Sequence, residues 1–280
     1  MYTLAIATAG EHTNPPLLML HGWNSYNGVW RSSMDALQDH FYCVAIDLLG
    51  FGRSDKPPHA NYSIQAQGRR VLAEADRRGY THFALAGHSM GAQIALWMAA
   101  NLCPSRVDFV VSVAGPVMPS LTRFSNCAVL PTVLLLSALP DLMRVGWRLA
   151  HRRWFAWTAL SWWFFHVREM PFDAWAEDRE MALLPDIVPA MCAAARAIYS
   201  LDLVPDLPAI HAPVLAIAGQ QDAAVPAHHS QVIHAQVPHS KLLLLERCGH
   251  FPMYEQPTAY LAALRRFALQ TKPPHEAVAS

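Results

Sequence analysis

The pentapeptide Gly87-His88-Ser89-Met90-Gly91 constrains the fold of this chain more than any other segment. It lies between an apolar run at 83–86 and a helix-forming run at 92–100, so it joins a strand to a helix through a sharp turn. Such a turn strains the serine backbone and leaves room only for hydrogen at its flanks, which explains the two glycines. The Ser89 hydroxyl is then exposed at the strand end, beside the free amides of the helix N-terminus. Ser89 is therefore a candidate nucleophile.

Short apolar runs alternate with helical patterns along most of the remaining sequence. Strands are predicted at 17–20, 42–46, 83–86, 109–113, 214–218 and 242–245, and helices near 30–38, 64–78, 90–102, 227–236 and 258–269. The predicted strands are short and almost continuously apolar, as strands covered on both faces are. This alternation predicts an α/β fold with a mostly parallel central sheet, flanking helices and right-handed crossovers.

The alternation is interrupted between residues 117 and 205. This segment holds six of the nine tryptophans, and its pattern predicts several helices and no strand. An all-helical insert between two strands of a parallel sheet is best interpreted as a cap over the strand ends. We therefore predict a core domain formed by residues 1–116 and 206–280, with a helical cap at 117–205.

Composition and charge exclude several classes of protein. The formal net charge of the 280 residues is zero and only 15% are charged, so nothing favours nucleic acid as a partner. The most apolar segment, 128–139, is shorter than the ~20 residues of a membrane-spanning helix. Five cysteines without a pairing pattern suit a reducing compartment, and the N-terminus lacks the pattern of a signal peptide. These features predict a soluble, cytoplasmic protein.

A serine nucleophile needs a general base, and the base needs an acid that orients it. His250 is the candidate base because its glycine-containing loop, 248–252, follows the last predicted strand. Asp222 is the candidate acid because it comes directly after the predicted strand 214–218. The carboxyl ends of parallel strands meet at one edge of the sheet, where ligand chemistry collects. The sequence therefore predicts that Ser89, Asp222 and His250 act together.

The oxyanion that forms during acyl transfer needs two preorganised donors. We predict the backbone N–H of Met90, which follows the nucleophile, as the first donor. The second is the backbone N–H of Trp23, because Gly22 in the loop after the strand 17–20 lets the backbone turn its amides inward.

Taken together, these motifs resemble those of α/β-hydrolases that carry a helical cap. The resemblance covers about residues 15–270 and rests on motifs in family order: His21-Gly22-Trp23, the Gly-rich turn 47–55, Gly87-His88-Ser89-Met90-Gly91, Gly219-Gln220-Gln221-Asp222 and Gly249-His250-Phe251-Pro252. Within the family, the motifs are similar to those of esterases and lactonases. Ser89 excludes the branches that use a nucleophilic aspartate. Phe251 counts against the carbon–carbon bond hydrolases, in which tryptophan often follows the catalytic histidine.

The resemblance implies cleavage of an ester, thioester or lactone of a hydrophobic small molecule through an acyl-enzyme on Ser89. The expected mechanism needs no metal and no cofactor. Aromatic side chains are expected to wall the substrate pocket, with Trp23, Trp154, Trp157 and Phe251 as candidates. Three alternatives stay open: a carbon–carbon or amide bond hydrolase with the same triad, an acyltransferase, and a small-molecule receptor of the same fold.

Two further patterns allow more than one interpretation. Arg144, Arg148 and Arg152 recur among cap tryptophans, which fits either peripheral contact with a membrane or, as we favour, a cap helix with a charged outer stripe. The histidine-rich stretch 228–239 has the wrong spacing for a metal site, and we interpret it as a solvated helix face. The oligomeric state is left open.

Overall fold

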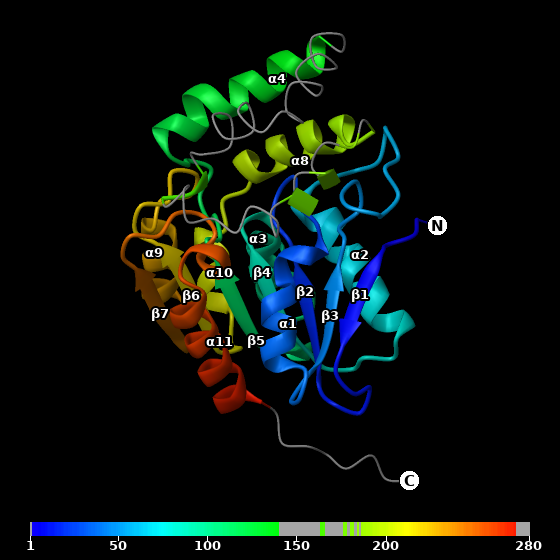
Figure 1. Cartoon of the computed structure of the whole chain (residues 1–280), viewed down its shortest axis with the longest axis vertical. Helices are drawn as coiled ribbons and strands as arrows, with labels where there is room; N and C mark the ends of the chain where they lie inside the picture. The colour runs from blue at the N-terminus through cyan, green and yellow to red at the C-terminus, as the bar shows by residue number, and fades with distance from the viewer. Residues whose placement is uncertain are drawn as a thin grey trace.

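A seven-stranded sheet forms the centre of the molecule (Figure 1). The computed structural model describes residues 2–139, 163–165, 176–177, 180–181, 184 and 186–272. Neighbouring strands in the order β1-β3-β2-β4-β5-β6-β7 pair in parallel, except that β1 is antiparallel to β3. The strands are β1 (Ile6–Ala9), β2 (Pro16–Leu20), β3 (Tyr42–Ile46), β4 (Phe83–His88), β5 (Val107–Val113), β6 (Val214–Gly219) and β7 (Ser240–Leu245). The predicted α/β class with a mostly parallel sheet is confirmed.

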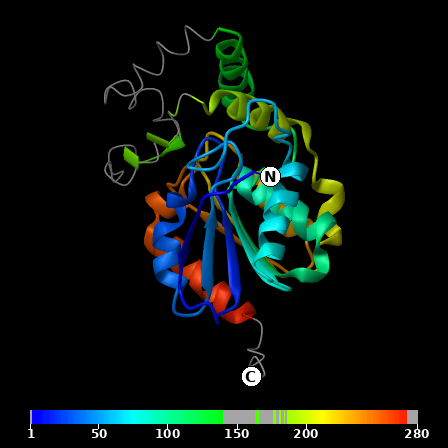
Figure 2. The same ribbon diagram turned by 90° about the vertical axis from the view of Figure 1, so that its right-hand side faces the viewer.

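Helices cover both faces of this sheet, as the view in Figure 2 shows. One face packs against α2 (Ile64–Arg77), α3 (Met90–Trp97), its π-helical extension η2 (Met98–Leu102) and α9 (His228–Gln236). The other face packs against α1 (Arg31–Leu37), α10 (Pro252–Glu255) and α11 (Pro257–Thr271). Single turns of 3₁₀ helix lie at η1 (Asn27–Trp30) and η3 (Pro104–Arg106). Every residue of β3, β4 and β6 is buried, which is why these strands are apolar apart from His88 at the end of β4.

The helix α2 illustrates how the local sequence sets these elements. The Ser63 hydroxyl accepts a hydrogen bond from the Ala66 N–H at 3.2 Å and caps the first turn. Ile64, Val71 and Ala75 recur at helical spacing and are buried against the sheet. Apolar spacing and a capping serine are both readable from sequence, and the helix begins where they predict.

In the segment between β5 and β6, the helices α4 (Leu130–Ala138) and α8 (Val188–Ser200) lie over the carboxyl ends of the strands (Figures 1 and 2). The described part of this segment contains only helices and no strand: η4 (Ser125–Val129), α4, α8 and η7 (Val204–Ala209). Among the helices that the structure describes, none is long and apolar enough to cross a membrane. The predicted limits of the cap, 117 and 205, stay a prediction. Trp154, Trp157, Arg144, Arg148 and Arg152 lie outside the described residues.

Glu177, within the predicted cap, is tied to the core by two arginines. Its carboxylate accepts hydrogen bonds from Arg31 at 2.9 Å and from Arg53 at 3.0 Å. These two guanidinium groups lower the pKa of Glu177 to about 2. Both arginine side chains are more than half exposed, so solvent and salt screen the pairs and each contributes little stability.

The edge strand β1 was not predicted from the sequence. It covers only Ile6–Ala9, is half exposed, and consists of small and β-branched residues without a clear apolar run. Its position is decided by antiparallel pairing with β3, in which Ile6 lies opposite Ile46 and Ala9 opposite Cys43. Because β3 is distant in sequence from β1, no local sequence pattern predicts this strand.

Candidate active site

The strand ends place Ser89, Asp222 and His250 along one edge of the sheet. His88 at the end of β4 pairs in register with Val113 of β5, and Gly219 at the end of β6 pairs with Leu245 of β7. The loops that follow β4, β6 and β7 therefore leave the sheet side by side. Because β2 pairs with both β3 and β4, the strand order reverses there, and open parallel sheets bind ligands at such points.

Ser89 has a strained backbone conformation, with φ at 52° and ψ at −118°. Its N–H donates to the Val113 carbonyl at 2.8 Å, and its carbonyl accepts from the Ala92 N–H at 2.9 Å. A positive φ is energetically unfavourable for a residue other than glycine, and backbone hydrogen bonds such as these two hold Ser89 in that conformation. The result is a serine fixed at the first residue before α3, where helix amides lack intrahelical partners.

The glycines on each side of Ser89 are required by the close approach of backbone. A Cβ at Gly87 would overlap the backbone of Gly91 and Ala92, and a Cβ at Gly91 would overlap the Leu20 and His21 carbonyl oxygens. The explanation of these two glycines from the sequence therefore agrees with the packing.

Substitution Gly91→Ala is expected to lower the free energy of unfolding by about 3 kcal/mol, because backbone atoms of a central strand cannot move aside. Gly79→Ala serves as the matched control: Gly79 has a φ of +72° but no neighbour within 4 Å of a new Cβ. That control is expected to cost only about 1–2 kcal/mol, from backbone conformation alone. Urea unfolding measures both, and an equal or smaller loss for Gly91→Ala would contradict the overlap argument.

Asp222 and His250 form a buried, directed pair. The Nδ1–H of His250 donates to Asp222 Oδ2 at 2.7 Å, while Asp222 Oδ1 accepts the N–H groups of Ala224 at 2.7 Å and Val225 at 3.0 Å. The two side chains are almost completely excluded from solvent. Since a carboxylate only accepts, Nδ1 carries the proton of the neutral ring and Nε2 is left as the basic nitrogen. This tautomer suits a general base.

His88 and Trp163 hold the backbone of His250, a role that we did not predict from sequence. The Nε2–H of His88 donates to the His250 carbonyl at 2.9 Å, and the His250 N–H donates to the Trp163 carbonyl at 2.9 Å. The Trp163 and His250 rings also lie 5.0 Å apart between centroids. Burial, followed by the proximity of His250, lowers the pKa of His88 well below its ordinary value, so His88 stays neutral. Its place next to the nucleophile was visible in the motif, but its contact with a residue 162 positions away was not.

The loop after β2 lies directly against the nucleophile. A Cβ at Gly22 would come within 2.9 Å of His88 Nδ1 and 3.1 Å of Ser89 Cβ. His21 fixes this loop, because its Nδ1–H donates to the Gly22 carbonyl at 2.7 Å and its Nε2 accepts the Leu48 N–H at 2.9 Å. The Trp23 indole N–H donates to the Met191 carbonyl of α8 at 2.8 Å. The assignment of the Trp23 and Met90 backbone amides to the oxyanion stays a prediction.

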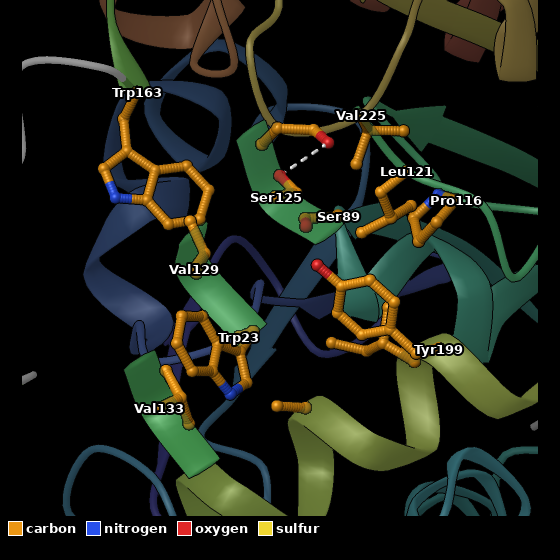
Figure 3. Close-up of a pocket in the computed structure, with 13 residues that line it drawn as sticks. Trp23, Ser89, Pro116, Leu121, Ser125, Val129, Val133, Trp163, Tyr199 and Val225 are labelled. Atoms are coloured by element: carbon orange, nitrogen blue, oxygen red, sulfur yellow. Dashed lines mark hydrogen bonds between the residues drawn. The ribbon is translucent and has the colours of Figure 1, made fainter. Parts of the chain in front are cut away.

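A largely apolar cavity opens next to Ser89 (Figure 3). Together with its mouth it encloses about 460 Å³. The polar side chains in its lining are those of Ser89, Ser125 and Tyr199, and the indoles are those of Trp23 and Trp163. The remaining lining residues come from the core and the cap segment: Pro116, Leu121, Val129, Val133, Ala195, Ile198, Ala224 and Val225. The wall is aliphatic as much as aromatic, which the tryptophan-rich sequence did not indicate.

Of the four predicted pocket residues, the described structure places only Trp23 in this lining. Phe251 is not among the lining residues; its ring instead stacks on Phe164 at 4.9 Å and on Tyr254 at 5.8 Å between centroids. The physical reason is that Phe251 precedes α10 and turns into the aromatic cluster beside that helix. The other two candidates lie outside the described residues.

The interpretation of His229 as part of a solvated face was wrong. His228, His234 and His239 are exposed, but His229 is only 1% exposed. Its Nδ1 accepts the Val117 N–H at 3.0 Å and its Nε2–H donates to the Ser120 carbonyl at 3.0 Å. Helix α9 therefore uses this imidazole to hold the chain between β5 and η4. In the part of the chain that the structure describes, no group of three metal-ligating side chains gathers here or elsewhere.

Stability is expected to fall as the pH drops below ~6.5, where histidines of the unfolded chain become protonated. Burial lowers the pKa of His21, His88 and His229 in the folded state, so the folded chain binds fewer protons than the unfolded chain. As the pH falls, each such histidine then lowers the free energy of unfolding by about 1.4 kcal/mol per pH unit, until the pH reaches the pKa of that histidine in the folded state. Urea unfolding between pH 7.5 and 5 measures the slope. The variant His229→Gln should reduce it, and an unchanged slope would contradict the assignment of His229.

Comparisons with known proteins agree with this geometry. A family model described as alpha/beta hydrolase fold matches residues 15–135. An uncharacterized protein of Mycobacterium tuberculosis is 28% identical over 288 residues, which cover 97% of this chain and 80% of the relative. A pimeloyl-[acyl-carrier protein] methyl ester esterase of Nitrosomonas europaea is 26% identical over 263 residues, covering 94% and 98%. The crystal structure of a membrane phospholipase A is similar with a TM-score of 0.79 and 26% identity, covering 97% of this chain and 84% of that one.

Sheet topology, the strained serine turn and these similarities together define an α/β-hydrolase fold. The resemblance to α/β-hydrolases that the motifs predicted is thereby confirmed, and the named proteins to which the chain is similar support the expected hydrolase.

Proposed function

We propose that this protein hydrolyses carboxylic esters of hydrophobic small molecules through an acyl-enzyme on Ser89. The observation that carries the proposal is the combination of a serine in a strained turn with a buried, directed Asp222–His250 pair at the same sheet edge. The relatives named above as a methyl ester esterase and a phospholipase both carry ester chemistry in their names, which supports the same bond type here.

In the proposed mechanism, His250 Nε2 takes the proton of the Ser89 hydroxyl as the oxygen attacks the ester carbonyl. The Asp222 carboxylate holds the imidazole in the required tautomer and stabilises the imidazolium that forms. The backbone N–H groups of Trp23 and Met90 stabilise the oxyanion. The imidazolium returns the proton to the leaving alkoxide, and a water activated by His250 then releases the acid from Ser89.

The cavity beside Ser89 supports an apolar acyl or alcohol group as the recognised part of the substrate. Valine, leucine, isoleucine and tryptophan side chains offer no charge that would bind an ionic group, and burying an unpaired charge among them would be costly. Each methylene placed against them contributes about 0.8 kcal/mol. Affinity should therefore rise with chain length until the cavity is full. Thioesters and lactones of the same hydrophobic character remain within the proposed substrate class.

A series of p-nitrophenyl esters with increasing acyl length tests the proposal together with the covalent inhibitor diethyl p-nitrophenyl phosphate. We expect kcat/KM to peak at an intermediate acyl length. In the inhibitor reaction the Ser89 oxygen displaces p-nitrophenolate, so one diethyl phosphate should be found by peptide mass mapping on the peptide that contains residue 89. Absence of both turnover and labelling, or labelling at another serine, would contradict the proposal.

The same experiment separates the alternatives that the sequence left open. An acyltransferase would form ester or amide product when an alcohol or amine is added, at the expense of free acid. A carbon–carbon or amide bond hydrolase would be labelled at Ser89 but would turn over the esters poorly. A receptor would bind apolar ligands with little turnover.

Because all five cysteines are free, we also propose that the protein works in a reducing compartment such as the cytoplasm.

A further inference from the structure

Two hydroxyl groups at the start of the predicted cap contact the loop that carries the candidate acid. The Thr122 hydroxyl donates to the Ala223 carbonyl at 2.5 Å. The Ser125 hydroxyl donates to the Ala224 carbonyl at 3.1 Å, which is the dashed contact in Figure 3. The Thr122 backbone N–H adds a longer contact to the Ala224 carbonyl at 3.4 Å. Segment 122–125 and the acid loop are thus joined by hydrogen bonds across about a hundred residues of sequence.

The same two peptide groups hold Asp222 on their opposite sides. The Ala223 carbonyl belongs to the peptide whose N–H, on Ala224, donates to Asp222 Oδ1. The Ala224 carbonyl belongs to the next peptide, whose N–H, on Val225, donates to the same oxygen. Each of these two consecutive peptide groups therefore accepts a hydrogen bond from a cap hydroxyl at its carbonyl oxygen and donates one to Asp222 Oδ1 from its N–H.

We propose that Thr122 and Ser125 are positioning residues for Asp222, acting through the peptide groups 223–224 and 224–225. The proposal rests on the proposed function, since it assigns a partner to the proposed catalytic acid. With Oδ1 held by two oriented N–H groups, Oδ2 points at His250 Nδ1 at 2.7 Å. Rotation of either peptide would turn its N–H away from the carboxylate, and a hydrogen bond on its carbonyl opposes that rotation.

The two cap hydroxyls also polarise the peptide groups that they contact, and this polarisation strengthens the hydrogen bonds to Asp222. A hydroxyl proton on the carbonyl oxygen of a peptide strengthens the partial positive charge on the N–H of that peptide, and hydrogen bonds in series reinforce one another in a low dielectric. Ser125, Ala224, Val225 and Asp222 are all buried, so water does not compete for these groups. The carboxylate is thereby stabilised without a lysine or arginine among its hydrogen-bond partners in the described residues.

The hydrogen atoms of this cluster are consistent with the arrangement. Each hydroxyl has one proton. The Thr122 hydroxyl has two acceptors within reach, the Ala223 carbonyl at 2.5 Å and Ser125 Oγ at 3.1 Å, and we assign its proton to the nearer carbonyl; the Ser125 proton goes to the Ala224 carbonyl. The Ser125 N–H donates to the Thr122 hydroxyl oxygen at 3.1 Å. Burial raises the pKa of Tyr199, which lines the same cavity, to about 12, so its hydroxyl stays protonated.

Ser125 also lines the cavity beside Ser89 (Figure 3). One residue of the predicted cap therefore touches both the substrate space and the loop of the acid. A cap that is displaced from segment 222–225 would leave the carboxylate less well oriented. Correct seating of the cap and correct orientation of the acid are thus expected to occur together.

The test compares Thr122→Val, which removes the hydroxyl at nearly constant shape, with Thr122→Ser, which keeps it, and with Thr132→Val on the exposed side of α4 as the control. We expect Thr122→Val to lower kcat for a p-nitrophenyl ester by about three- to ten-fold with little change in KM. Thr122→Ser should recover most of that loss, and Thr132→Val should behave as the native protein. Thermal unfolding of each variant checks that the fold is intact.

Proton NMR of the substrate-free protein gives a readout of the pair itself. The His250 Nδ1–H, hydrogen-bonded to Asp222, should resonate far downfield in the native protein and shift upfield or broaden in Thr122→Val and in Ser125→Ala. An unchanged resonance together with unchanged kcat in both variants would overturn the proposal. Because the resonance needs no turnover, it still tests this inference if Ser89 proves not to be the nucleophile, so the two failures are distinguishable.

Discussion

Substitution Ser89→Ala is expected to lower kcat/KM for p-nitrophenyl esters by about 10⁴- to 10⁶-fold, because loss of a nucleophile removes the covalent route entirely. The fold should persist, since alanine keeps the backbone bonds of residue 89 to Val113 and Ala92. Binding of an apolar product acid should also persist, because the cavity wall is unchanged apart from one oxygen.

Ser105→Ala is the matched control, since Ser105 is exposed in η3 at the opposite end of the strands from Ser89. It should retain native activity and native labelling by the organophosphate. Ester hydrolysis by Ser89→Ala at a rate close to the native one would mean that another group carries the reaction, and the proposed mechanism would be wrong.

Substitution Asp222→Asn is expected to lower kcat by about 10⁴-fold with a much smaller effect on KM. The asparagine Oδ1 can still accept the Ala224 and Val225 N–H groups, so the loop should keep its shape. The amide NH₂ then faces His250 Nδ1 in place of Oδ2 and can only donate to it. That contact favours the tautomer with the proton on Nε2, which cannot take the proton of Ser89.

Steady-state kinetics at saturating ester measures this loss, with Asp202→Asn as the control. Asp202 is exposed near the predicted end of the cap and accepts the Val204 N–H at 3.0 Å, a bond that asparagine also makes. Equal activities of Asp222→Asn and Asp202→Asn would place the catalytic acid elsewhere. A full loss of folding in Asp222→Asn alone would instead show that the carboxylate charge is structural.

Much of the fold could be predicted because its signals are local. Each parallel strand is an apolar run, and each predicted strand from 17–20 to 242–245 appears in the sheet with ends shifted by a few residues. Strand β1 could not be predicted, because its only strong signal is its pairing with β3. The helix 90–102 was predicted as one element, whereas the structure ends α3 at Trp97 and continues as a π-helical turn.

In the candidate site, too, residues in short motifs could be predicted, whereas contacts between residues far apart in the sequence could not. Ser89, Asp222 and His250 were each found from a short motif at a strand end, and the structure brings Asp222 and His250 into contact. His229 was misinterpreted because its neighbours 228 and 234 are exposed, and only contacts with residues 117 and 120 show that it is buried. Phe251 was assigned to the pocket from its place beside His250, although its ring turns to Phe164.

The sequence alone determined the order of the six parallel strands and of the helices between them, the serine turn with its two glycines, and the identity of the three candidate catalytic residues. These are properties of a residue and its near neighbours, set by sterics and by apolar periodicity. Only the tertiary structure decided which side chains line the cavity, how His88 and Trp163 hold His250, and how Thr122 and Ser125 meet the acid loop. Those contacts join residues about ninety or more positions apart, and they exist only once the sheet has formed and its helices have packed.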